Sequence, residues 1–83
     1  MDLDALLQEY FGTTDLAQAT ASGQAAGLER LQVDFGLSKD RGQRFALWLL
    51  MYTLGAAPDI DVAFKDAQDR DAARDMMELL AGE

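Results

Sequence analysis

The fold is decided by the segment Phe45-Ala46-Leu47-Trp48-Leu49-Leu50-Met51-Tyr52-Thr53-Leu54, in which every residue except Thr53 is apolar. A helix that is apolar on all its faces has to be covered on all its faces. The unbroken apolar run ends at Tyr52, far short of the roughly 20 residues that a membrane span needs. We therefore predict a central buried helix over about residues 39–54, with Ser38 as its N-cap and Gly55 closing it.

The segments on both sides of this helix have the apolar spacing of amphipathic helices, so they can cover it. We expect one helix over residues 2–11, stopped by Gly12, and a second over about 24–35, capped by Ser22 or Gly23 and ended by Gly36. A separate turn is expected within residues 16–21, after the cap residues 13–15. The spacing of Gly23 and Gly27 permits a close helix approach. The apolar faces of the two helices comprise Leu3, Leu6, Leu7 and Tyr10, and Ala25, Leu28, Leu31 and Phe35.

The last segment, residues 58–81, carries two apolar faces that do not line up. The face around Phe64 and the face around Met76 differ by roughly 140–150° at the α-helical 100° per residue. An unbroken helix would present its second face to another chain and so predicts a dimer. We favour a break near residues 65–69, with Asp66 or Asp69 capping the final helix.

Composition agrees with an all-α fold, a compact bundle of four or five short helices around a central buried helix. β-branched residues are scarce and Pro58 is the only proline, which favours helix over strand. The chain has 83 residues, so we expect residues 1–83 to form a single helical domain.

The net charge of −8 is unevenly distributed: residues 1–38 carry −5, residues 39–58 carry +2 and residues 59–83 carry −5. An acidic body suits a basic partner and opposes broad contact with nucleic acid phosphates. The chain contains no cysteine, and its first residues are acidic where a signal peptide would be basic. We therefore expect a cytoplasmic protein without a membrane segment.

The residues needed for the common catalytic and metal sites are missing. Without histidine or cysteine the chain cannot build Ser–His or Cys–His nucleophiles. The acidic stretch from Asp59 begins like a calcium loop, but it has Phe64 where the loop requires glycine and Arg70 where it requires glutamate. We expect no catalytic residue, no cofactor and no metal ligand, and hence no enzyme.

Residues 31–45 resemble a helix-turn-helix, the DNA-reading motif. A helix is followed by Gly36, by Ser38 and then by basic and amide side chains of the kind that contact phosphates and base edges. The departures are Gly42, where the motif usually has an apolar anchor, the adjacent acids Asp34 and Asp40, and the continuation into a buried helix. A nucleic-acid-binding role is therefore the alternative, and an ordinary helix-helix turn is favoured.

Lys39, Arg41 and Arg44 occupy the first turns of the central helix, where cations oppose the positive end of the helix dipole. We expect a negatively charged group to compensate for this unfavourable interaction. One candidate is an external anion or an acidic surface of a partner. The other is an acid of the chain itself: Glu29, Asp34, Asp66 or Asp69. We favour the internal acids and keep the three cations as candidate contacts for an anion or a partner.

These observations lead to one functional expectation. The chain is a small acidic protein without enzymatic activity, a protein-protein interaction or regulatory module. Its expected partner is a basic protein or a second copy of itself.

Overall fold

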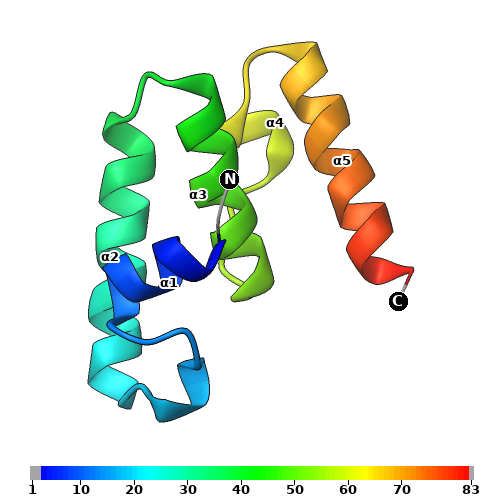
Figure 1. Cartoon of the computed structure of the whole chain (residues 1–83). Coiled ribbons are helices and arrows are strands. Elements are labelled where there is room, and N and C mark those ends of the chain that lie inside the picture. Colours follow the sequence, from blue (N-terminus) through cyan, green and yellow to red (C-terminus); the bar gives the residue numbers. More distant parts are fainter. Residues whose placement is uncertain (1–2, 83) are drawn as a thin grey trace.

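The computed structural model describes residues 3–82, which form an all-α bundle without strands (Figure 1). The predicted fold class is therefore confirmed. In chain order the elements are α1 (Leu3–Phe11), the 3₁₀ turn η1 (Leu16–Gln18), α2 (Ala21–Leu37), α3 (Arg41–Thr53), α4 (Ile60–Ala63) and α5 (Ala67–Ala81).

The central position of α3 follows from its apolar sequence. In Figure 1, α3 lies between α2 and α5, and α1 packs against both α2 and α3. Every residue from Ala46 to Met51 is buried, with exposed fractions between 0 and 8 %. The prediction of a helix covered on all sides is confirmed for these residues, while Phe45, Tyr52 and Leu54 at its ends are half-buried. The helix itself is slightly shorter than the expected 39–54.

The start of α2 differs from the sequence prediction. Thr20 is the N-cap, and its Oγ1 accepts a hydrogen bond from the Gly23 amide at 3.0 Å. Ser22 and Gly23 lie inside the helix, so their prediction as caps was wrong. A threonine hydroxyl satisfies a free amide of the first turn, which a glycine cap cannot do. The expected separate turn is η1, capped by Asp15.

The predicted helix ends are right at two glycines and wrong at one. Gly12 and Gly55 have positive φ angles of 72° and 76°, the left-handed conformation that stops a helix and that glycine adopts without strain. Gly36 lacks a positive φ, and α2 continues through it to Leu37.

The predicted break in the last segment is confirmed. The short helix α4 ends at Ala63, and α5 begins at Ala67 with Asp66 as N-cap. The Asp66 carboxylate accepts a hydrogen bond from the Gln68 amide at 2.7 Å. Because the chain bends here, Phe64 and Ala73 both reach the same core despite their different helical phase.

Helices α1 and α2 approach each other closely at Gly27. A Cβ atom at this position would lie 2.5 Å from the Phe11 ring and 2.6 Å from the Tyr10 carbonyl oxygen. The close approach expected from the small-residue spacing is thus present at Gly27. At Gly23 a Cβ would meet only the Thr20 hydroxyl.

Trp48 holds the segment that connects α3 to α4 against the core. Its Nε1 donates a hydrogen bond to the Pro58 carbonyl oxygen at 2.9 Å, and its ring stacks on Tyr52 with centroids 5.4 Å apart. Phe64 packs edge-on against the same indole at 5.6 Å. The irregular segment between α3 and α4 is therefore held by the most deeply buried aromatic residue.

Candidate functional site

The three cations chosen from the sequence surround the turn between α2 and α3. Asp40 begins α3, and its carboxylate accepts a hydrogen bond from the Gln43 amide at 2.9 Å. The predicted N-cap, Ser38, is two residues too early: it follows the last residue of α2 and donates its hydroxyl to the Gln43 side chain at 3.0 Å. A carboxylate at this cap also suits the positive end of the helix dipole, which explains why Asp40 takes it.

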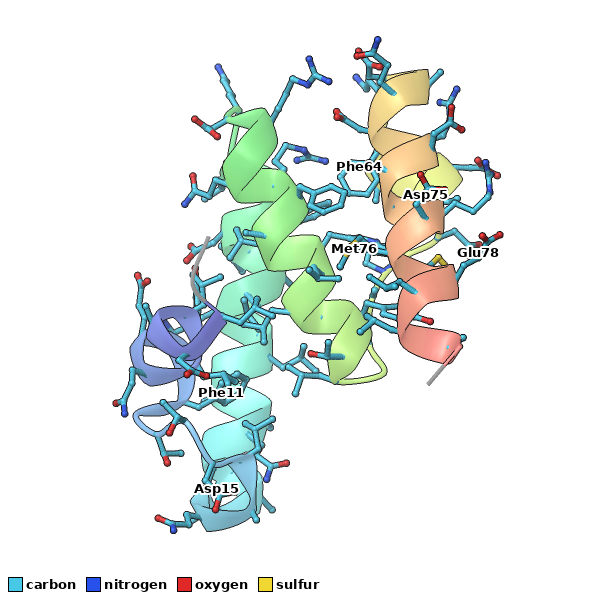
Figure 2. The ribbon with its side chains drawn as sticks, turned by 45° about the vertical axis from the view of Figure 1, so that its right-hand side comes forward. Phe11, Asp15, Phe64, Asp75, Met76 and Glu78 are labelled. Carbon is cyan, nitrogen blue, oxygen red and sulfur yellow. The ribbon has the colours of Figure 1, made fainter. Side chains whose placement is uncertain are left out.

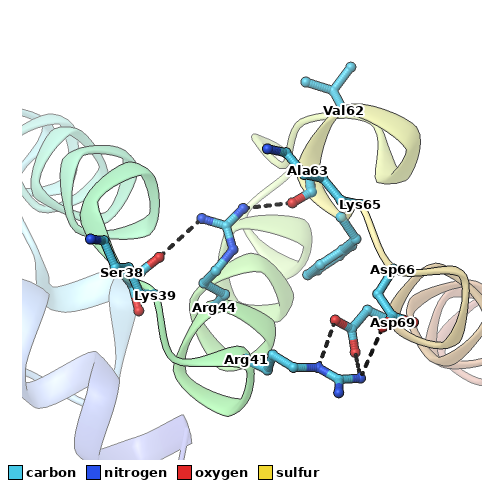
Figure 3. Close-up of a pocket in the computed structure, with 10 residues that line it drawn as sticks. Ser38, Lys39, Arg41, Arg44, Val62, Ala63, Lys65, Asp66 and Asp69 are labelled. Carbon is cyan, nitrogen blue, oxygen red and sulfur yellow. Dashed lines mark hydrogen bonds and ion pairs between the residues drawn. The ribbon is translucent and has the colours of Figure 1, made fainter.

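Arg44 points into the protein. Its Nη1 donates to the Phe35 carbonyl oxygen at 2.7 Å. Figure 3 shows its two further bonds, from Nη2 to the Ala63 carbonyl oxygen at 2.6 Å and from Nη1 to the Ser38 carbonyl oxygen at 3.4 Å. The guanidinium also lies 4.1 Å above the centre of the Phe35 ring. These carbonyls are at the C-terminal ends of α2 and α4, where backbone acceptors lack helical partners and the dipole attracts a cation.

The direct partners of Arg44 are peptide carbonyls and not the acids that the sequence suggested, although the charge of Arg44 also helps to lower the pKa of Asp69. Although Arg44 belongs to the first turn of α3, its charge lies at the C-terminal ends of two other helices. Peptide carbonyls hold it there, and no carboxylate is within ion-pair distance of it among residues 3–82. Arg44, a residue of α3, therefore links α3 to the C-terminal ends of α2 and α4.

Arg41 has the internal acid partner that the sequence predicted. Its Nη2 and Nε donate to the two carboxylate oxygens of Asp69 at 2.8 and 3.2 Å, and Asp66 lies 3.9 Å from Nη2 (Figure 3). The hydrogen bond with Arg41 lowers the pKa of Asp69, and the same bond raises the pKa of Arg41. The Arg41 side chain is 62 % exposed, so water screens this pair and limits its contribution to stability.

The other two acids considered as internal partners, Glu29 and Asp34, do not meet this cluster. Asp34 accepts a hydrogen bond from the Tyr10 hydroxyl, which ties α1 to α2. Burial of Tyr10, together with this bond and the charge of Asp34, raises the pKa of the phenol well above its usual value. Glu29 lies exposed on α2.

The turn opens into a cleft of about 450 Å³ between α3 and the segment that joins α4 to α5. Six charged residues line it: Lys39, Lys65, Arg41, Arg44, Asp66 and Asp69. The ammonium groups of Lys39 and Lys65 have no ion-pair or hydrogen-bond partner in the described part of the chain. Sequence reasoning missed Lys65, because only the bend before α5 brings it to the cleft that Lys39 also lines.

This cleft can attract an anion, but it is not built to bind one firmly. Both arginines direct their donors to groups of the chain itself, and two carboxylates share the lining. For a nucleic acid docking on residues 31–45, only Lys39 offers an unoccupied charge near the turn. Within residues 3–82, no group of three or more acids is arranged to hold a metal ion, and no helix is long and apolar enough to cross a membrane.

No family model, curated protein or solved structure matches the chain.

Proposed function

We propose that this protein is a non-enzymatic interaction module that binds a basic protein partner. The observation that carries the proposal is how the chain uses its arginines. The guanidinium group of every arginine contacts a carbonyl, a carboxylate or a ring of the same chain; the residues are Arg30, Arg41, Arg44, Arg70 and Arg74.

Most acids, in contrast, remain directed to solvent. Among residues 5–82, the carboxylates that take part in ion pairs are those of Asp66, Asp69 and Asp71. The net charge of −8 is therefore a property of the accessible surface. Such a surface raises the association rate of a basic partner and repels other acidic molecules.

The same charge distribution favours a basic partner over a second copy. Two molecules with a charge of −8 each repel one another at any face that is not locally basic. The absence of histidine and cysteine from the sequence supports a role without nucleophilic catalysis. Nucleic acid binding through residues 31–45 has less support, because Arg41 and Arg44 are held by the chain's own groups.

The test is to use the whole chain as bait in an extract of its native cells. Each retained protein is then purified and its Kd for the chain measured by calorimetry. We expect a partner with a basic surface, whose Kd rises as salt increases from about 0.1 to about 1 M, over which the Debye length shrinks from roughly 10 to 3 Å. A partner of neutral or acidic surface with a salt-independent Kd contradicts the proposal, as does the failure of every basic protein to bind at low salt.

Nucleic acid is tested in parallel by a gel shift with duplex and single-stranded DNA at low salt, where phosphate contacts are strongest. We expect no shift. A shift that disappears in the variant Lys39→Gln would favour nucleic acid over a basic protein as the ligand.

A further inference from the structure

The outer flank of α5 carries apolar side chains that the core does not cover. Ala73 is fully buried, yet Leu79 and Leu80 in the last turns are 63 % and 41 % exposed. At 3.6 residues per turn, Leu79 lies within roughly 20° of Ala72 around the helix axis. The apolar face of α5 is therefore wider than the part that packs on the core: Met76 still packs against the core, and the free edge beside it holds Ala72 and Leu79.

This free edge continues a groove between α3 and α5. The groove has a volume of about 430 Å³ and is lined by Gly42 and Phe45 of α3, by Ala72 of α5 and by the paired side chains of Arg41 and Asp69. Gly42 has no side chain to fill the space, so the Phe45 ring stays accessible. Figure 2 shows Met76 on the side of α5 that faces α3.

An acidic edge borders the apolar stripe on its outer side. Asp75 and Glu78 are exposed, and their carboxylates have no ion-pair or hydrogen-bond partner among residues 3–82. In Figure 2 Glu78 points away from α3. The nearby Asp71 differs, since Arg74 lies 3.4 Å from its carboxylate. Two like charges three residues apart on a helix repel each other, so a cation from outside would stabilise this edge.

We infer that the α5 flank, defined as Ala72, Leu79, Asp75 and Glu78, is the docking surface for a basic amphipathic helix of the partner. The apolar side of that helix covers the stripe and the groove beside Phe45. Its lysines or arginines face Asp75 and Glu78. This inference rests on the proposed function, and it adds the place and the shape of the contact.

Charge decides between this occupant and a second copy of the chain. A symmetric contact through the α5 flank would bring the two acidic edges close together, in a protein that is already strongly negative. A basic helix supplies opposite charge at the same positions. Helix-in-groove recognition uses this combination of an apolar stripe and charged borders.

In the experiment, the whole chain is titrated into labelled synthetic helical peptides of about 15 residues. The fluorescence anisotropy of the label reports binding. One peptide places leucines on one face and lysines on the other. A second has the same composition in an order that mixes the two kinds of residue, and a third has glutamate for lysine. We expect the first to bind about tenfold more tightly than the second, because only it can bury a leucine face. The third should not bind.

Variants locate the surface. Leu79→Asn should raise the Kd of the first peptide about tenfold, whereas Leu37→Asn should leave it unchanged. Leu37 is the matched control because it is 74 % exposed at the end of α2. The double variant D75N/E78Q should raise the Kd several-fold at low salt, and E9Q/E29Q, which removes the same charge from α1 and α2, should change it less than about twofold.

Each contrary outcome has a separate meaning. If E9Q/E29Q weakens binding as much as D75N/E78Q, or if the mixed peptide binds equally well, net charge alone drives binding; the α5 flank is then wrong while the proposed function stands. If no lysine peptide binds, the inference fails, and the proposed function then depends on the extract experiment alone. Sedimentation that shows a dimer of the chain, lost in Leu79→Asn, would assign the flank to a second copy.

Discussion

The α1–α2–α3 unit and α5 differ in how completely they bury their hydrophobic side chains. In the unit, α3 is buried over six consecutive residues, and α1 approaches α2 so closely that only glycine fits at position 27. Helix α5 buries one alanine fully and leaves two leucines in water. The difference predicts that the unit contributes more to the stability of the protein than α5 does.

The largest effect is expected from Leu47→Ala, at a position with no exposed surface. Removing a buried leucine leaves a cavity and should lower the free energy of unfolding by about 2–5 kcal/mol. Leu79→Ala, in contrast, should change it by less than about 0.5 kcal/mol, because the side chain already faces water. Urea unfolding of both variants measures this. Equal losses would show that α5 is as tightly packed as α3.

The next effect is expected from Arg44→Met, which keeps an unbranched apolar stem and removes the guanidinium donors. The Phe35 and Ala63 carbonyls then lose charged hydrogen bonds, each of a kind that contributes about 1.5–3 kcal/mol. We expect a loss of about 2–3 kcal/mol in urea unfolding, since water replaces part of the contact. The control Lys39→Gln removes a neighbouring exposed cation and should be neutral. If Arg44→Met leaves the free energy of unfolding unchanged, these hydrogen bonds do not stabilise the fold, and Arg44 becomes a candidate for binding an external anion or partner.

A smaller effect separates two glycines of α2. Gly27→Ala forces a Cβ against the Phe11 ring and the Tyr10 carbonyl, and should cost about 1–2 kcal/mol after the gain in helix propensity. Gly36→Ala meets nothing within 4 Å and should stabilise the protein by about 0.5–1 kcal/mol. Thermal unfolding of the pair measures the difference. Stabilisation by both substitutions would mean that α1 and α2 can move apart freely.

The smallest effect concerns the link from α3 to α5 and depends on pH. Because Arg41 lowers the pKa of Asp69 below its ordinary value of 3.8, this pair stabilises the fold above that pH and loses its effect as the pH falls below it. The urea midpoint of the wild type should therefore fall more steeply on acidification than that of Asp69→Asn. Glu29→Gln is the control, as an exposed acid far from the pair. Parallel curves for the wild type and Asp69→Asn would show that the pair does not hold α5.

The sequence predicted those parts of the fold that depend on local pattern. The apolar run beginning at Phe45 placed the central helix, and the change of phase between Phe64 and Met76 placed the break before α5. Cap residues were harder to predict, because Thr20 and Ser22, or Ser38 and Asp40, compete within two residues of each other. Which of them caps depends on where the preceding chain directs the backbone.

The candidate site was less predictable, because side chains reach partners distant in sequence. The sequence marks Arg44 as a cation in an unfavourable helix position, but it gives no sign that the Ala63 carbonyl would receive it. Lys65 joins the cleft only through the bend. The exposed edge of α5 did have a signal, the seven-residue spacing of Ala72 and Leu79 beside Asp75. It was hidden by the stronger pattern of Ala73, Met76, Met77 and Leu80.

Trp48 is an intrinsic fluorescence probe of the fold. It is the single tryptophan, it is 1 % exposed, and its indole N–H is bound to the Pro58 carbonyl. Emission from one indole therefore records whether the connection that leads to α4 and α5 is seated on the core. A partial opening that detaches this connection while α1, α2 and α3 stay together would shift the emission wavelength before the circular dichroism signal falls.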